Sequence, residues 1–240
     1  MRDLLSLHGL TQAKTKEHWD ERDGGARLAR DKALIAVSYP DLKYGINART
    51  EEIFLYGAMT LVSTSGIPTQ IQTRVVFPDN YPYEEPKAYD IASRFFPHDL
   101  DRHFWSDERC CLWFPLESEW DSEDSNALIN FLYQLALFFM RQLIYEADPS
   151  QGWAWGQRSH GIWGFLEYIQ DKLGVSQTLV DNFAPLLTGN LVIQPREPCP
   201  CNSRLRYKAC HASIVRQLVG SISREMMSRI FREKTKAEQK

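Results

Sequence analysis

The sequence predicts an α+β fold, because strand-like and helix-like patterns occupy separate stretches of the 240 residues. In TQIQTRVVF, Ile71, Thr73 and Val75 alternate with polar residues, which is the two-residue period of a strand with one buried face. The neighbouring stretches EEIFLYGAMTLV and PKAYDIA read as further strands, so residues 44–92 predict an antiparallel meander. Helical patterns lie before and after it.

In the N-terminal half, residues 1–37 predict a helical segment with a break at Gly24-Gly25, and it ends before Pro40. The meander follows. Residues 93–124 then predict an irregular segment, which contains the adjacent pair Cys110-Cys111.

The C-terminal half predicts four helices. The first, 127–145, takes its N-cap from Asp124-Ser125-Asn126, and we expect a buried helix rather than a membrane span because polar residues interrupt it: Asn130, Gln134 and Arg141. The others are 161–173, which ends at Gly174, a short helix within 177–188, and 212–236, whose apolar stripe is Ile214, Leu218, Ile222, Met226 and Ile230.

Composition indicates a cytoplasmic globular protein. With 43% hydrophobic residues the chain can build a core, and no secretion signal is visible. The net charge of −3 is unevenly spread, since eleven Lys and Arg stand against four Glu from Arg196 onward. This basic end is expected either to dock on an acidic protein surface or nucleic acid, or simply to be a solvated helix.

Three of the five cysteines fall within a C-x-C-x8-C-H array of Cys199, Cys201, Cys210 and His211. Three thiolates and one imidazole on two tight turns suit tetrahedral zinc in a closed, structural site. The array resembles the SEC-C motif, a small zinc module found at the ends of many unrelated proteins, and the resemblance implies docking on a partner. One departure is Asn202-Ser203-Arg204, where that motif has Gly-Ser-Gly.

The stretch FPDNYPYEEP, residues 77–86, resembles the hallmark of ubiquitin-conjugating enzymes, FP-x-x-YP-x-x-P-P-x, with Pro86 on the second of the two adjacent prolines. The later stretch RHFWSDERCCLW is most similar to the prokaryotic branch, R-H-x-N-x-D-G-x-x-C-L, with Trp105 in place of Asn and Glu108 in place of Gly. Trp120 and the stretch QRSHG also match. The resemblance implies the UBC fold: an N-terminal helix, a four-stranded antiparallel meander and C-terminal helices.

The same resemblance implies a cysteine nucleophile. Cys111, which precedes Leu112, takes the thioester-forming position, and Cys110 is a packing residue. His103 stands where the family places an oxyanion donor, and Asp148 and His160 are candidates for catalytic support. The reversed assignment of the two cysteines, and an inert pair, are the alternatives.

The implied chemistry is two acyl transfers, onto the Cys111 thiolate and then onto an amine. A thiol pKa near its ordinary value suits this task.

The resemblance further implies an antiphage defence (CBASS-type) operon, in which the C-terminus of a cGAS-like nucleotidyltransferase is conjugated. We expect this protein partner in preference to nucleic acid, and no membrane. The alternatives are an inactive UBC-fold scaffold and a Cys/His hydrolase using His160 or His98 as base.

These assignments predict three parts: a catalytic domain over 1–175, a helical linker over 176–195, and a zinc module with a basic helix over 196–240.

Overall fold

A computed structural model of the 240-residue chain describes residues 18–21, 25–62, 66–98, 102–154 and 158–239. Its contacts form two compact units, which we treat separately. The sheet unit comprises residues 1–112 and 119–143, and the helical unit comprises 113–118 and 144–240. The three-part division predicted from the sequence concerns function and stays a prediction.

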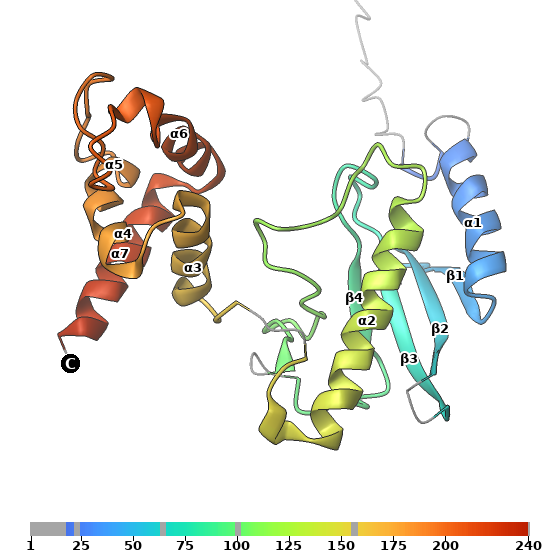
Figure 1. The fold of residues 1–240 in the computed structure, drawn as a ribbon. Helices are drawn as coiled ribbons and strands as arrows, with labels where there is room; N and C mark the ends of the chain where they lie inside the picture. The colour runs from blue at the N-terminus through green and yellow to red at the C-terminus, as the bar shows by residue number, and fades with distance from the viewer. Residues whose placement is uncertain (1–17, 22–24, 63–65, 99–101, 155–157, 240) are drawn as a thin grey trace, which may run out of the picture. The chain divides into compact units, whose positions relative to one another are not determined.

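The sheet unit is built on a four-stranded antiparallel meander (Figure 1). Its strands are β1 (Leu42–Ile46), β2 (Ile53–Val62), β3 (Pro68–Val76) and β4 (Lys87–Asp90), in the order β1-β2-β3-β4. The alternation seen in the sequence sets the buried face, because Ile71, Thr73 and Val75 are each 0% exposed. The predicted α+β arrangement and meander are therefore confirmed.

Helix α1 (Ala26–Ser38) begins at Gly25, whose φ of 76° only glycine adopts readily. The predicted N-terminal helix is confirmed from residue 26 onward. It is wrong for residues 18–21, which form a turn. Residues 1–17 lie outside the described part of the chain.

Helix α2 (Ala127–Ala147) begins where the sequence predicted. The Asp124 carboxylate accepts hydrogen bonds from the Asn126 backbone N–H at 2.8 Å and the Asn130 amide at 2.7 Å. Among the described residues, α2 is the one helix that is long and apolar enough to cross a membrane. However, it lies over the sheet (Figure 1) and buries one face: Ala127, Leu128, Phe131, Leu132, Leu135, Phe138, Phe139 and Gln142. That burial is what a core helix requires.

The helical unit contains α3 (Ile162–Leu173), α4 (Gln177–Val180), α5 (Ala184–Leu187), α6 (Ala212–Ser221) and α7 (Arg224–Glu238), with 3₁₀ turns between some of them. The predicted short helix within 177–188 is realised as α4, a 3₁₀ turn and α5. A single hydrophobic core joins α3 to the later helices: Leu166, Tyr168, Ile169, Leu173, Val180, Phe183, Leu186, Leu187, Cys199, Val215, Leu218, Ile222, Met227, Ile230 and Phe231.

The predicted helix over 212–236 is wrong in one respect, because two helices replace it. Ile222 is extended, with φ −120° and ψ 126°, and it ends α6. Ser223 then caps α7, its hydroxyl accepting a hydrogen bond from the Met226 N–H at 3.2 Å. A serine cap outcompetes helix continuation here, which an apolar stripe alone does not reveal.

Candidate metal centre and candidate thiol site

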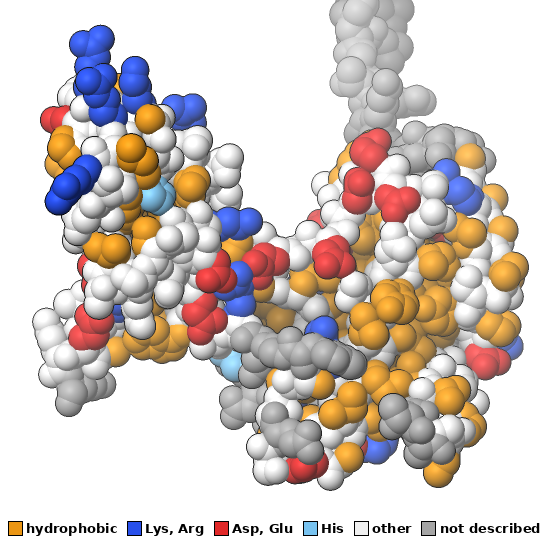
Figure 2. Space-filling view, in the orientation of Figure 1, with side chains coloured by type: hydrophobic (Ala, Val, Ile, Leu, Met, Phe, Trp, Pro, Cys, Tyr) orange, Lys and Arg blue, Asp and Glu red, His pale blue; other side chains and the backbone are white. Residues whose placement is uncertain are grey.

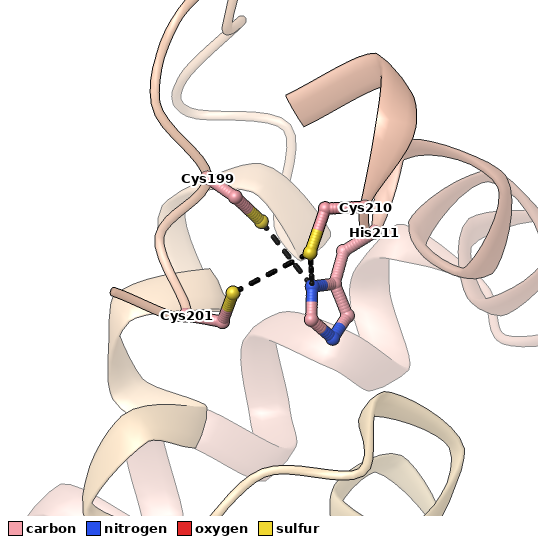
Figure 3. A group of neighbouring side chains, drawn as sticks. All are labelled: Cys199, Cys201, Cys210 and His211. Carbon is pink, nitrogen blue, oxygen red and sulfur yellow. Dashed lines mark hydrogen bonds between the residues drawn. The ribbon is translucent and has the colours of Figure 1, made fainter. Parts of the chain in front are cut away.

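The four predicted metal ligands come together in the helical unit (Figure 3). Their ligand atoms all lie within 4.8 Å of one another. Cys199 Sγ is 3.2 Å and Cys210 Sγ is 3.0 Å from His211 Nδ1, while Cys201 Sγ is 3.5 Å from Cys210 Sγ. Tetrahedral zinc with ~2.3 Å bonds to sulfur places its ligands about 3.8 Å apart, so this set fits such an ion.

A narrow backbone turn presents the first two cysteines. The Cys199 N–H donates to the Leu205 carbonyl at 2.9 Å, and Pro198 pairs with Arg206. Within the turn, Asn202 has φ 62° and Arg204 has φ 64°. These are the two positions where the SEC-C motif carries glycine, and both need the left-handed backbone. Asn adopts that region readily, whereas Arg does so at a cost.

His211 is oriented by a contact that spacing alone does not predict. Its Nε2 donates to the Leu173 carbonyl at the end of α3, 2.7 Å away, which leaves Nδ1 facing the sulfur atoms. The Phe183 ring lies edge-on at 5.1 Å. Ser203 is a further unpredicted member, since its hydroxyl lies 3.1 Å from Cys201 Sγ and accepts from the Leu205 N–H. The signal for it was its match to the serine of the Gly-Ser-Gly stretch in the SEC-C motif.

The thiols of this cluster differ electrostatically. Burial raises the pKa of Cys199 to about 11. Burial also opposes ionisation of Cys201, but hydrogen bonds from the Ser203 hydroxyl and backbone outweigh it and lower that pKa to about 6. A bound cation would favour the thiolate at all three cysteines, so metal binding would release protons.

Exposed basic side chains lie in the same segment of the chain as the cluster. Figure 2 shows blue side chains on the end of the helical unit that carries the α5–α6 connection, and Arg196, Arg204, Arg206 and Lys208 in that connection are exposed. Glu197 is the sole acidic residue between 191 and 223. The charge asymmetry of the sequence is therefore a property of this surface.

The candidate nucleophile lies on a small hairpin in the sheet unit. The Cys111 N–H donates to the His103 carbonyl at 2.8 Å, Phe104 pairs with Cys110, and the Trp105 N–H donates to the Arg109 carbonyl at 2.9 Å. The second arm docks on β4 through the Cys110 N–H and the Ala88 carbonyl, 2.8 Å apart. The hairpin thus places His103 across from Cys111. Its turn includes Glu108, whose φ is 65°. The pattern of the prokaryotic branch, R-H-x-N-x-D-G-x-x-C-L, has glycine at this position.

The two adjacent cysteines face different surroundings. Cys110 is 6% exposed, and burial followed by the nearby Asp90 charge raises the pKa of its thiol. Cys111 is half-buried, and burial raises its pKa to about 11. The pKa of Cys111 is thus above the ordinary value that would suit the implied acyl transfer, because desolvation outweighs the attraction of Arg109.

The other histidine and acidic candidates lie as follows. His98 is buried beside Asp90, with 3.1 Å between its Nε2 and Oδ2, and its ring lies 4.3 Å from Phe104. Asp148 caps a 3₁₀ turn by accepting from Ser150. His160 directly precedes the Gly161 N-cap of α3. Asp148 and His160 belong to the helical unit, so their support of Cys111 stays a prediction.

The proline-rich segment proves to be an anchor for α1. The Tyr81 hydroxyl donates to Asp31 Oδ2 at 2.7 Å, and Arg27 Nε donates to the same oxygen at 3.2 Å. Tyr81 and Asp31 are both 0% exposed. Trp120 Nε1 donates to the Pro82 carbonyl at 2.8 Å, which ties the later tryptophan to the same segment. No local pattern indicated a role for Asp31, because its partner Tyr81 lies 50 residues away.

Comparisons with known proteins agree with part of this arrangement. No curated protein matches the sequence significantly. Among solved structures, the yeast vps23 UEV domain in complex with a vps27 PSDP peptide is similar, with 14% identity over 51% of this chain and 85% of that chain and a TM-score of 0.38. A likeness of this size does not assign a fold family. The SEC-C motif model matches residues 196–213, which include all four clustered ligands. The chain therefore carries a SEC-C motif, and its Cys/His cluster is compatible with a metal-binding site.

Proposed function

We propose that this protein is a ubiquitin-conjugating-like cysteine acyltransferase of UBC type, joined to a zinc-holding SEC-C module that docks on a partner. The observation that carries the proposal is the hairpin geometry. Of the two adjacent cysteines, Cys111 is the more exposed and lies across from His103, while Cys110 is buried against β4.

In the proposed reaction, the Cys111 thiolate attacks the activated C-terminal carbonyl carbon of a partner protein. The carbonyl oxygen becomes an oxyanion as the C–S bond forms, and the original leaving group then departs. His103 would donate a hydrogen bond to that oxyanion. An amine next attacks the thioester, expels the Cys111 thiolate and loses its proton to water.

The module's four ligands would hold a structural zinc ion, whose chemistry is to fix the turn and not to react, because three thiolates and one imidazole leave no open position. Reduced thiols in both sites suit the cytoplasm. The partner we propose is the C-terminus of a cGAS-like nucleotidyltransferase in a CBASS-type defence operon, which rests on the sequence resemblance alone.

The partial burial of Cys111 favours a second candidate, a non-catalytic scaffold on the same fold. A Cys111 pKa of about 11 leaves few thiolates at neutral pH, which slows nucleophilic attack. In that case the chain would bind its partner through the SEC-C module without chemistry at Cys111.

Intact-mass analysis and non-reducing gels separate the two candidates. The chain is co-expressed with the products of its neighbouring genes as wild type, Cys111→Ala and Cys110→Ala. We expect an adduct that collapses with thiol reductant, persists in Cys110→Ala, disappears in Cys111→Ala and contains a neighbour's C-terminus. Co-purification of a neighbour with no adduct in any variant selects the scaffold.

The metal is tested independently by elemental analysis. We expect about one zinc per chain in the wild type and in Cys110→Ala, and loss of it in Cys199→Ala and His211→Ala. Equal zinc in all four proteins rules out this site.

A further inference from the structure

The hairpin that carries Cys111 has two faces, and its register decides which side chains share each face. The pairing described above places residues 103–105 of one arm opposite residues 109–111 of the other. Successive side chains of a strand point to opposite faces, so Phe104 and Cys110 share one face, and both are buried. The opposite face carries four half-buried residues: His103, Trp105, Arg109 and Cys111.

Arg109 is held in place on this second face. Its guanidinium lies over the Trp105 ring, 4.8 Å from the ring centroid, and its Nε is 3.4 Å from the Asp107 carboxylate. Its backbone pairs with Tyr89 of β4, which fixes the arm beneath the side chain. The Arg109 side chain is only 33% exposed, so water and salt screen its charge less than that of a fully exposed arginine. The aromatic ring thus keeps a cation on the face that carries Cys111.

Arg109 and Cys111 are neighbours along one arm. Because they are two residues apart, their Cα atoms lie about 6–7 Å apart and their side chains leave the arm on the same side. Burial raises the pKa of the Cys111 thiol, Arg109 lowers it, and Glu85 of the proline-rich segment raises it further. The register also places Lys87 of β4 on this face, two residues before Tyr89. Of these two cations, Arg109 is the one whose charge acts on Cys111.

We propose that Arg109 stabilises the Cys111 thiolate, and that Trp105 is the positioning residue that holds the Arg109 guanidinium for this task. In the proposed reaction the thiolate occurs twice. It forms first, when the thiol proton passes to water before attack on the donor carbonyl carbon. It forms again when the amine makes its C–N bond and the electron pair of the breaking C–S bond returns to sulfur. A neighbouring cation favours the anion at both points.

Trp105 replaces the Asn of the prokaryotic pattern, and the stacked arginine gives this replacement a role. The catalytic meaning of that role rests on the proposed acyltransferase function. The effect of Arg109 on the thiol does not, because the reactive thiolate can be measured with a neutral alkylating reagent.

The test is the rate at which iodoacetamide modifies Cys111 in the full-length chain, resolved from the other cysteines by peptide mass spectrometry. We expect Arg109→Gln to slow the reaction about fivefold at every pH between about 7 and 10, because less thiolate forms once the cation is lost. Trp105→Leu should slow it about twofold. Arg109→Lys, which keeps the charge and loses the planar stack, should lie between the wild type and Arg109→Gln. Glu85→Gln should accelerate the reaction about twofold.

The ion pair of Arg109 with Asp107 separates electrostatics from packing. If the pair only held the hairpin together, Asp107→Asn and Arg109→Gln would shift the rate in the same direction. If the Arg109 charge acts on the thiolate, Asp107→Asn should accelerate the reaction, since it removes an anion and leaves the cation. Raising the salt concentration from about 0.05 M to about 1 M should also bring Arg109→Gln and the wild type within about twofold of each other.

Arg74→Gln is the matched control. Arg74 also has an ion pair, with Glu52, and its guanidinium also lies over a ring, that of Phe54 at 4.2 Å. It stands on β3, with β4 between it and the hairpin, and its loss should leave the Cys111 rate within about 1.5-fold of the wild type. Circular dichroism establishes that each variant is folded. Should Arg109→Gln fail to fold, Arg109→Lys and Asp107→Asn replace it.

Equal rates in the wild type and in folded Arg109→Gln overturn the inference. So does a slower rate in Asp107→Asn, and so does a loss in Arg74→Gln or Lys87→Gln as large as that in Arg109→Gln. If Arg109→Gln slows alkylation as expected in a protein that never forms a thioester, the action of Arg109 on the thiolate stands and the proposed function alone is rejected.

Discussion

At the scale of single residues, backbone conformation explains what is at stake where Asn202 and Arg204 replace the two glycines of the SEC-C motif. Positions 202 and 204 both have positive φ, so the glycines usual in the SEC-C motif serve the turn rather than the metal. The ligand cluster forms here with Asn and Arg in those places. What changes is the stability of the turn.

We expect Arg204→Gly to raise the free energy of unfolding by about 0.5–1 kcal/mol, because relief of the left-handed strain exceeds the extra freedom that glycine gives the unfolded chain. Arg206→Gly is the control, since Arg206 has an ordinary φ of −67°. That variant should be neutral or destabilised. Urea denaturation at fixed zinc concentration measures both. Equal effects of the two substitutions would show that charge loss, not backbone strain, is responsible.

The Cys111 thiol gives a pH prediction. Because burial raises its folded pKa to about 11, alkylation should accelerate about tenfold per pH unit from pH 7 to 10. In guanidinium-unfolded chain the same rate should level off above about pH 8.5. The same pKa difference affects stability. The contribution of the buried, neutral Cys111 thiol to the free energy of unfolding is fully present below the pKa of the unfolded chain, about 8.5. This contribution is lost as the pH rises from there through the folded pKa of about 11. A plateau near pH 8.5 in the folded chain would contradict this.

At the scale of elements, the proline-rich segment connects α1 to the sheet. The motif residue Tyr81 meets Asp31 of α1, and Trp120 returns to Pro82. The proline-rich segment thus contributes packing contacts between elements that lie far apart in the chain.

We expect Tyr81→Phe to cost about 1.5–3 kcal/mol, because it removes a hydrogen bond to a fully buried carboxylate. Tyr83→Phe, in the same segment but 69% exposed, should change stability by less than about 0.5 kcal/mol. Denaturant unfolding followed by tryptophan fluorescence compares them. Similar losses in both would mean that the segment contributes through its prolines and not through the Tyr81–Asp31 contact.

At the scale of the whole molecule, the metal cluster is part of a larger core rather than an isolated finger. Cys199 belongs to the core that includes α3, and His211 donates to the end of α3. Loss of a bound metal should therefore destabilise parts of the helical unit well beyond residues 196–213.

We expect a zinc chelator to lower the hydrogen-exchange protection of α3 and α6 amides by at least about tenfold, while β2 and β3 amides keep theirs. Cys199→Ser should reproduce the pattern without chelator. Parallel loss of protection in β2 and β3 would show instead that the two units unfold together.

Local patterns were sufficient for much of this architecture. The alternation at Ile71–Val75 and the cap at Asp124 are encoded within a few residues, and so is the metal array, because its ligands lie on one short turn and the following helix start. The split between α6 and α7 was missed because a serine cap competes with an uninterrupted apolar stripe.

By itself, the sequence determined the α+β class, the order of the elements and the four Cys and His residues of the cluster, since each depends on neighbours in the chain. Only the tertiary structure decided that burial raises the pKa of the Cys111 thiol, that Leu173 orients His211 and that Arg158 donates to the Glu117 carboxylate. Those contacts join residues 38 and 41 positions apart. Desolvation and long-range pairing arise only when the chain has folded, so no local pattern contains them.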